Sequence, residues 1–187
     1  MDIVLASGSP RRKELLETLG LEFTICPAKG EECPPQGMGP DETVKALSLA
    51  KAREVAQVYP EALIIAADTI VWADSRILGK PRSEAQAEEM LALLSGSSHE
   101  VYTGVTLICG EKTVCRSECT KVFFRDLSDG EIRAYVKTGE PMDKAGAYGI
   151  QGRAAMMVRR IEGDYFNVMG LPLCALGQML EQIGVQL

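Results

Sequence analysis

The feature that most constrains the fold is ALIIAADTIVW, residues 62–72, an apolar run interrupted by one acid, Asp68. A run without a polar face is typical of a strand that is covered on both sides of its sheet. We therefore expect a buried strand that ends near Asp68. A carboxylate at that point lies where α/β proteins place ligands, and it can bind a divalent cation or activate a water molecule. The alternative is an acid exposed in the loop after the strand.

The other segments alternate in a pattern that predicts the fold class. Helix starts are indicated by Ser9 followed by Pro10, and by two capping boxes, Ser83 with Gln86 and Ser128 with Glu131. Apolar periodicity predicts helices over 10–19, 41–59, 83–94, 128–136 and 171–184, and strands over 2–6, 21–26, 99–109 and 112–124. Residues 154–163 and 164–170 are expected to form a hairpin. Strands and helices alternate in the first part of the chain, and in the later part strands follow one another in antiparallel pairs. This order predicts an α/β fold with a mixed β-sheet.

Length and composition narrow the class of protein. The 187 residues predict a single domain over 1–187, and 46% hydrophobic and 25% charged residues are typical of a globular protein. The net charge of −6 does not favour binding of a nucleic acid polymer. No apolar run reaches the ~18 residues of a membrane-spanning helix. Six cysteines without a C-x-x-C pair, and a start unlike a secretory signal, predict reduced thiols and a cytoplasmic protein.

The stretch SGSPRRK, residues 7–13, places cations at the start of an expected helix. The helix dipole already makes that end positive, so the arrangement is unfavourable unless an anion binds there. Gly8 allows close backbone approach, and Arg11 and Arg12 add hydrogen-bond donors, which together predict a phosphate cradle. Taken alone, a capped helix with solvated arginines explains the same residues about equally well.

Three further stretches carry residues that suit a phosphate or metal site, and each also has a simpler explanation. The acidic pair at 31–32 is either solvated or provides a second carboxylate beside Asp68 for Mg²⁺. Lys80, in LGKPRS, is either a phosphate ligand or part of a surface turn. Lys51 lies on an expected helix, where a solvated cation is the simpler explanation.

The loop DKAGAYGIQGR, residues 143–153, combines glycines with groups that can recognise a base. Tyr148 offers an aromatic ring for stacking, and Gln151 offers one acceptor and two donors for the edge of a pyrimidine. A flexible surface loop is the alternative. His99, the single histidine, is expected to serve structure rather than catalysis, because no Cys or Ser partner is evident around it.

Taken in order, LASGSPRRKELL, the EE pair, LAKAR, ADTIV, GKP, LSGSSHEVYTGV and GEPMDKAGAYGIQGR resemble the Maf family over nearly the whole chain. Maf proteins were first described as septum-formation inhibitors and are nucleoside triphosphate pyrophosphatases. The resemblance implies a fold similar to the inosine triphosphate pyrophosphatases: an elongated mixed β-sheet flanked by helices, with two lobes around a central cleft. It also implies hydrolysis between the α- and β-phosphates of a nucleotide, with a divalent metal cation, Mg²⁺ or Mn²⁺, as cofactor.

The resemblance further implies roles for individual residues. The implied catalytic residues are Asp68, Glu32, Lys51 and Lys80, with Glu32 and Asp68 as metal ligands. The implied substrate-binding residues are Ser7, Arg11, Arg12, Thr69 and Gln151. The loop that carries Gln151 resembles the branch acting on dTTP and UTP, with release of the nucleoside monophosphate and pyrophosphate. Whether Asp68 takes a proton from water or holds the cation is left open.

Two other functions remain open from the sequence. One is a non-catalytic, nucleotide-binding regulator of septum formation, and the other is the same enzyme with a different preference, such as 7-methyl-GTP. The intact set of Asp68, Glu32 and Lys80 favours an enzyme, because sensing alone does not require it. The expected partner is a small nucleotide, with neither a nucleic acid polymer nor a membrane, and the family suggests a homodimer with a house-cleaning role.

Overall fold

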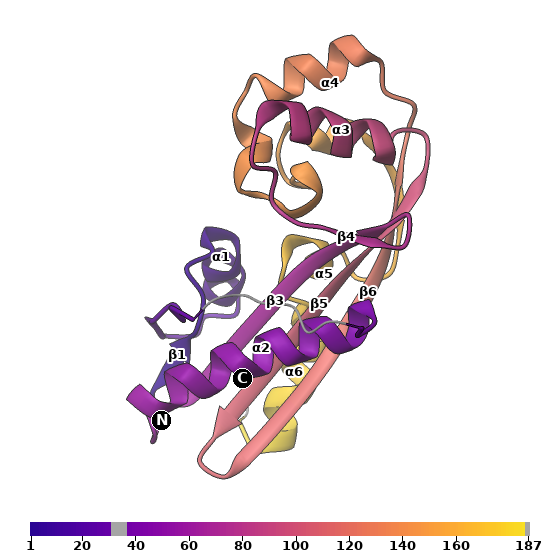
Figure 1. Cartoon of the computed structure of the whole chain (residues 1–187). Helices are drawn as coiled ribbons and strands as arrows, with labels where there is room; N and C mark the ends of the chain where they lie inside the picture. Colours follow the sequence, from indigo (N-terminus) through magenta and orange to yellow (C-terminus); the bar gives the residue numbers. More distant parts are fainter. Residues whose placement is uncertain (31–36, 186–187) are drawn as a thin grey trace. The chain divides into compact units, whose positions relative to one another are not determined.

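A computed structural model describes residues 1–30 and 37–185 of the chain. Two compact units can be distinguished, and they are described separately below (Figure 1). Unit 1 contains residues 1–69, 103–118 and the chain from Gly170 onward, and unit 2 contains residues 70–102 and 119–169. The assignment of the whole chain to a single domain stays a prediction. In the described residues the strands form one seven-stranded sheet, in the order β2-β1-β3-β5-β6-β7, with β4 added beside β3.

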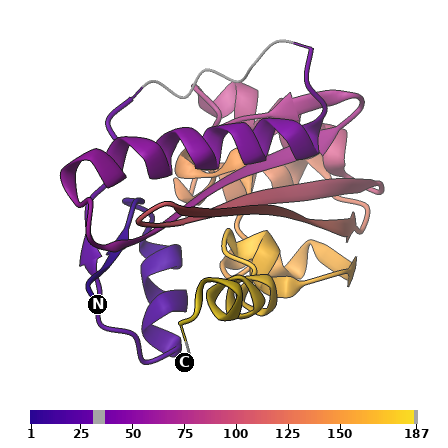
Figure 2. The ribbon, with the colours of Figure 1, turned by 90° about the horizontal axis from the view of Figure 1, so that it is seen from below.

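Unit 1 begins with a parallel β-α-β arrangement. The central strand β1 (Ile3–Leu5) lies between β2 (Thr24–Ile25) and β3 (Leu63–Ala73), and both pairings are parallel. Helix α1 (Pro10–Thr18) connects β1 to β2, and α2 (Pro40–Val58) precedes β3. Figure 2 shows α2 on one face of the sheet, with α1 and the last helix, α6 (Leu173–Ile183), on the other. The apolar β1 and β3 are therefore covered on both sides, as their composition requires.

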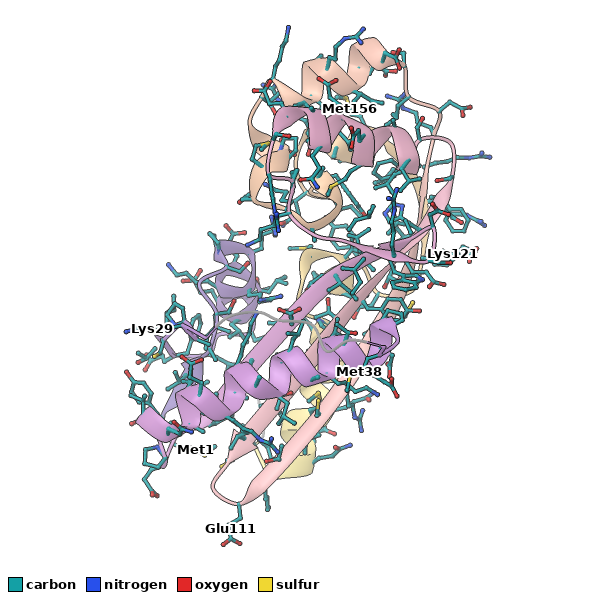
Figure 3. The ribbon with its side chains drawn as sticks, viewed as in Figure 1. Met1, Lys29, Met38, Glu111, Lys121 and Met156 are labelled. Carbon is teal, nitrogen blue, oxygen red and sulfur yellow. The ribbon has the colours of Figure 1, made fainter. Side chains whose placement is uncertain are left out.

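The core of unit 1 follows from this layering. Val4 and Ile64, which are register partners on β1 and β3, are fully buried against Ala52 and Val55 of α2. On the expected helical stripe, α6 buries Leu176, Met179, Leu180 and Ile183. The strands β5 (Ser98–Cys109) and β6 (Lys112–Phe124) are neighbours in the sheet, and Glu111 marks the turn between them in Figure 3.

Unit 2 combines strand segments with short helices. Strand β4 (Arg76–Leu78) pairs antiparallel with β3, and β7 (Val158–Glu162) pairs antiparallel with β6. Helix α3 (Glu84–Leu94) packs against α4 (Asp129–Val136). Three short 3-10 helices, η1 (Glu140–Asp143), η2 (Ala145–Ala147) and η3 (Arg153–Met156), follow α4.

Most predicted elements are confirmed, including the helix starts. Pro10 begins α1 directly after Ser9, and the Ser128–Glu131 capping box is complete. Ser83 accepts the N–H of Gln86, whose side chain reaches the N–H of Arg82. The mixed α/β sheet flanked by helices is also as predicted.

The end of the apolar strand was predicted wrongly. Strand β3 continues to Ala73, so Asp68 lies inside the strand rather than near its end. The residues after Asp68 are β-branched or aromatic, TIVW, and favour an extended backbone. Beyond Asp68 the strand gains β4 as an antiparallel neighbour, with Val71 opposite Leu78.

The hairpin expected over 154–170 is also wrong. Residues Tyr165–Met169 form a short helix, α5, and β7 takes β6 as its partner instead. The Asp164 carboxylate accepts the N–H groups of Phe166 and Asn167, which stabilises the start of a helical turn. This local capping outweighs the strand preference of Tyr165 and Phe166.

Two expectations about the class of protein can be compared with the structure. In the described ranges the cysteines are free thiols: Cys26, Cys109, Cys115, Cys119 and Cys174. None of the helices that the structure describes is both long and apolar enough to span a membrane.

Candidate active site

A buried ion pair lies at the middle of β3. Lys51 Nζ, from α2, donates to Asp68 Oδ1 at 2.5 Å, and Asp68 is only 6% exposed. An unpaired buried carboxylate would cost several kcal/mol, so the ammonium group of Lys51 is what makes this position tenable. The helical register explains the placement, because the next residue, Ala52, is fully buried against the same sheet. Lys51 is therefore not the solvated cation that its helix alone suggested.

Arg12 of α1 is held beside Thr69, the residue of β3 that follows Asp68, by a network of hydrogen bonds. Its Nη1 donates to Ser7 Oγ and its Nη2 donates to Thr69 Oγ1, both at 3.0 Å. Its Nε donates to the carbonyl oxygen of Gly170 at 2.7 Å, and Thr69 Oγ1 lies 2.9 Å from Thr103 Oγ1. These contacts fix the plane of a guanidinium that is suited to phosphate oxygens.

The two sets of contacts approach β3 from opposite sides. Successive residues of a strand point to opposite faces, so Asp68 meets Lys51 of α2 while Thr69 meets Arg12 of α1. The local strand order β2-β1-β3 reverses direction at β1, with α1 and α2 on different faces. Ligands of α/β sheets bind at such a switch point, beyond the carboxyl ends of the strands. Ser7 follows the end of β1 there. Five predicted residues therefore lie around this point: Ser7, Arg12, Lys51, Asp68 and Thr69.

The start of α1 adds positive charge to this position. The backbone carbonyl of Ser9 accepts the N–H of Lys13, and the first turn contains Arg11, Arg12 and Lys13 with no acid to offset the helix dipole. Arg11 is half-buried on this turn, whereas Lys13 is exposed and pairs with Glu17. A helix start with one oriented arginine is an arrangement that suits an anion.

The remaining predicted residues lie elsewhere in the chain. Lys80 is exposed directly after β4, and the preceding carbonyl, of Gly79, accepts the N–H of Gly146 at 3.1 Å. Gln151 is exposed in a turn of unit 2, between Ile150 and Gly152. Glu32 lies outside the described residues.

Tyr148 does not have the role predicted for it. Its ring is buried edge-on against His99 and Phe124, and its hydroxyl lies 2.7 Å from His99 Nε2. Burial raises the pKa of Tyr148 above its usual range. Stacking of this ring on a base is therefore excluded, because burial in the apolar core of unit 2 is more favourable for the ring than exposure in the loop. His99 is 2% exposed, in agreement with a structural role, and burial lowers its pKa to about 4.

The chemistry of the site suits a divalent cation through Asp68. Carboxylate oxygens are the donors that Mg²⁺ and Mn²⁺ prefer. Across residues 1–30 and 37–185, no group of three or more His, Cys, Asp or Glu side chains is placed to hold a metal. A cation at Asp68 would therefore need further ligands from outside these residues, such as Glu32 and the phosphates of a substrate.

Two contributors to the site were not recognised in the sequence. Thr103 supports Thr69 from β5, and Gly170 supplies the carbonyl acceptor for Arg12. A backbone carbonyl leaves no residue-specific signal, so Gly170 could not be found this way. A threonine inside the strand HEVYTGV is ordinary by propensity, and only its pairing with Thr69 gives it significance.

The family comparison decides what kind of protein carries this arrangement. The model of the family described as Maf-like protein matches residues 2–183. The chain belongs to the Maf family. This Maf protein is 52% identical over 179 residues to a dTTP/UTP pyrophosphatase of Bacillus cytotoxicus, with 96% of this chain and 94% of that one covered. It is 53% identical over 186 residues to a dTTP/UTP pyrophosphatase of Moorella thermoacetica, with 98% and 95% covered.

Solved structures show the same fold as this Maf protein. The Staphylococcus aureus Ham1 protein has a TM-score of 0.54 at 13% identity, and the match covers 98% of this chain and 100% of that chain. A HAM1 protein from Coxiella burnetii has a TM-score of 0.50 at 18% identity, covering 97% and 99%. These likenesses concern the fold alone, and they confirm the predicted α/β class.

Proposed function

We propose that this Maf protein is a nucleoside triphosphate pyrophosphatase that hydrolyses dTTP and UTP. The observation that carries the proposal is the pair of contacts at adjacent positions of β3, Lys51 with Asp68 and Arg12 with Thr69. Relatives that bear the name dTTP/UTP pyrophosphatase match nearly the whole chain at about 50% identity, which supports the same activity here.

The cations of the site suit a triphosphate. Arg12 and Lys51 come from different helices and bring their charges to consecutive residues of one strand, from opposite faces of the sheet. Because other side chains orient Arg12 before a ligand arrives, little ordering remains to oppose binding. Lys80 is proposed as a further phosphate ligand on the family resemblance, and its side chain is exposed.

The proposed reaction breaks the bond between the bridging oxygen and the α-phosphorus. The oxygen of water attacks this phosphorus, pyrophosphate leaves with the bridging oxygen, and the water loses its proton to a base. Asp68 either accepts this proton or holds the cation together with Glu32. A divalent cation, Mg²⁺ or Mn²⁺, when bound, neutralises charge that develops on the phosphate oxygens.

Base selection is assigned to Gln151 and Arg11. The amide of Gln151 offers an acceptor for N3–H and a donor for O4 of uracil or thymine. Its exposure in a turn supports this assignment. Thr69 enters the proposal through Arg12, whose guanidinium it orients.

A nucleotide panel tests the function. The purified protein is incubated with Mg²⁺ or Mn²⁺ and with dTTP, UTP, CTP, GTP, ATP and 7-methyl-GTP, and pyrophosphate release is measured. We expect release from dTTP and UTP at the highest kcat/KM. Release from none of them would overturn the enzyme and favour a regulator, while a preference for 7-methyl-GTP would overturn the pyrimidine assignment.

Two further statements belong to the proposal. The protein acts in the cytoplasm, supported by thiols that are free in the described residues. It forms a homodimer, as the family resemblance suggests. Light scattering on the purified protein tests the second statement, and a mass of one chain, 20.3 kDa, would overturn it.

A further inference from the structure

Gln151 is presented by a tight turn rather than by a loose loop. The N–H of Gly152 donates to the carbonyl of Gly149 at 3.0 Å, which closes a turn with Ile150 and Gln151 at its centre. Ile150 is buried, whereas Gln151 is exposed. The exposed amide of Gln151 therefore projects from a short segment that is anchored on both sides.

Glu140 anchors the segment after the turn. Its Oε2 accepts the backbone N–H of Arg153 at 3.1 Å, and its Oε1 accepts the hydroxyl of Tyr135 at 3.0 Å. A Cβ added to Gly152 would lie 2.0 Å from Glu140 Oε1, so the carboxylate would have to move away from its present position. The absence of a side chain at Gly152 thus lets the carboxylate stay where it accepts the N–H of Arg153.

Tyr148 anchors the segment before the turn. Its hydroxyl is 2.7 Å from His99 Nε2, and its ring centroid is 4.9 Å from that of Phe124. The chain from Tyr148 to Arg153 is therefore held at both ends by groups inside unit 2.

We propose that Glu140 is a positioning residue that sets base selection by fixing the turn on which Gln151 lies, with Tyr148 as the second anchor. This inference rests on the proposed function, in which Gln151 pairs with the base. A flexible amide pairs with several base edges and pays an ordering cost on each binding event, whereas a fixed one matches a single pattern of donors and acceptors. Nothing in this role involves contact between Glu140 and the phosphates.

Kinetics of Glu140→Ala distinguish positioning from general support. Loss of two hydrogen bonds to a carboxylate is expected to raise the KM for UTP and dTTP about threefold, less than removal of the Gln151 amide itself, because Glu140 acts only through the turn. We expect kcat to stay within about twofold, because the contacts of Asp68 and Arg12 are made in unit 1. The preference for UTP over GTP should fall by a similar factor.

Three further variants make the test specific. Glu140→Gln keeps an acceptor for Arg153 N–H and gains an NH₂ that can donate to the Tyr135 oxygen, so it should restore most of the selectivity. Gly152→Ala should be harmful in the native protein but much less so beside Glu140→Ala, where the carboxylate is gone. Glu131→Ala removes a carboxylate that caps α4 and pairs with Arg125, and serves as the matched control in unit 2.

Amide hydrogen exchange provides a readout that does not depend on activity. In the ligand-free protein, Glu140→Ala should increase exchange at Arg153 and Gly152, and Glu140→Gln should restore protection, while Glu131→Ala leaves both unchanged. Unchanged selectivity in Glu140→Ala, or an equal loss in Glu131→Ala, would overturn the proposal even when the native protein is fully active. A native protein that releases no pyrophosphate would overturn the proposed function instead, and unaltered exchange at Arg153 would then still overturn the anchoring role.

Discussion

The two units hold their functional groups in different ways. In unit 1, Arg12 and Lys51 lie on the helices α1 and α2, and each is fixed by a hydrogen bond to a side chain of β3. In unit 2, Gln151 is carried by a turn whose backbone is fixed at Arg153 by Glu140. Strands and helices place charges with little freedom, while an anchored turn can change its exposed residue without disturbing a core. Substitutions of Asp68 and Arg12 should therefore affect turnover of the nucleotide, and substitutions around the turn should affect base selection.

The largest expected effect is that of Asp68→Asn. The change keeps the shape of the side chain but removes the charge that pairs with Lys51, and with it either the base or the metal ligand. We expect kcat for UTP to fall by about 10²–10⁴-fold, the range of acid–base catalysis. Asp74→Asn, in the exposed turn after β3, is the control and should be unaffected. Near-native turnover in Asp68→Asn would remove this carboxylate from the mechanism.

The next effect concerns stability and acts in unit 2, which contains the single histidine. Burial lowers the pKa of His99 to about 4 from 6.5, so between these values the unfolded chain binds a proton that the native ring does not. The free energy of unfolding therefore falls as the pH decreases through this window, by about 3 kcal/mol at pH 4. Around the ring lie Tyr148 and Phe124, neither of which supplies a compensating negative charge.

Urea unfolding at pH 7 and pH 4.5, followed by the fluorescence of Trp72 in unit 2, measures this loss. His99→Gln should flatten the pH dependence over the same window. If that variant does not fold, Tyr148→Phe leaves the histidine buried and should retain the slope. An equal pH dependence in His99→Gln and the native protein would assign the loss to other groups.

A smaller effect is expected from Arg12→Lys. Lysine keeps the positive charge but cannot reach Ser7, Thr69 and the Gly170 carbonyl together, because it has one nitrogen in place of a planar fork. We expect kcat/KM for dTTP to fall about tenfold to fiftyfold, corresponding to about 1.4–2.3 kcal/mol. Lys13→Ala, on the exposed side of the same helix turn, should change it by less than about twofold. Equal behaviour of the two variants would refute an oriented guanidinium.

The smallest effect should be that of Gln151→Ala. Removal of the amide is expected to lower the ratio of kcat/KM for UTP over CTP about fivefold, with kcat for UTP nearly unchanged. Gln57→Ala, on the exposed face of α2, is the control. A fall of about tenfold or more in kcat for UTP would erase the distinction between the two units.

The sequence predicts elements better than it predicts their ends. Ser9 with Pro10 and Ser128 with Glu131 locate helix starts because capping acts within one turn. The end of β3 was missed because the tolerance of Asp68 inside a strand depends on Lys51, which lies 17 positions earlier on another element. Tyr148 was misassigned for a similar reason, since an aromatic ring in a glycine-rich loop looks available until His99 and Phe124 cover it.

The hydrogen bond from Arg12 to the Gly170 carbonyl also has a consequence for synthesis of the protein. Arg12 and Gly170 are separated by 158 positions, so the guanidinium emerges from the ribosome long before its acceptor does. A nascent chain can fold β1, α1 and β2 early, but Arg12 gains its third contact only when the segment leading into α6 has been translated. A chain that ends before Gly170 lacks this acceptor, so its guanidinium keeps only the contacts with Ser7 and Thr69.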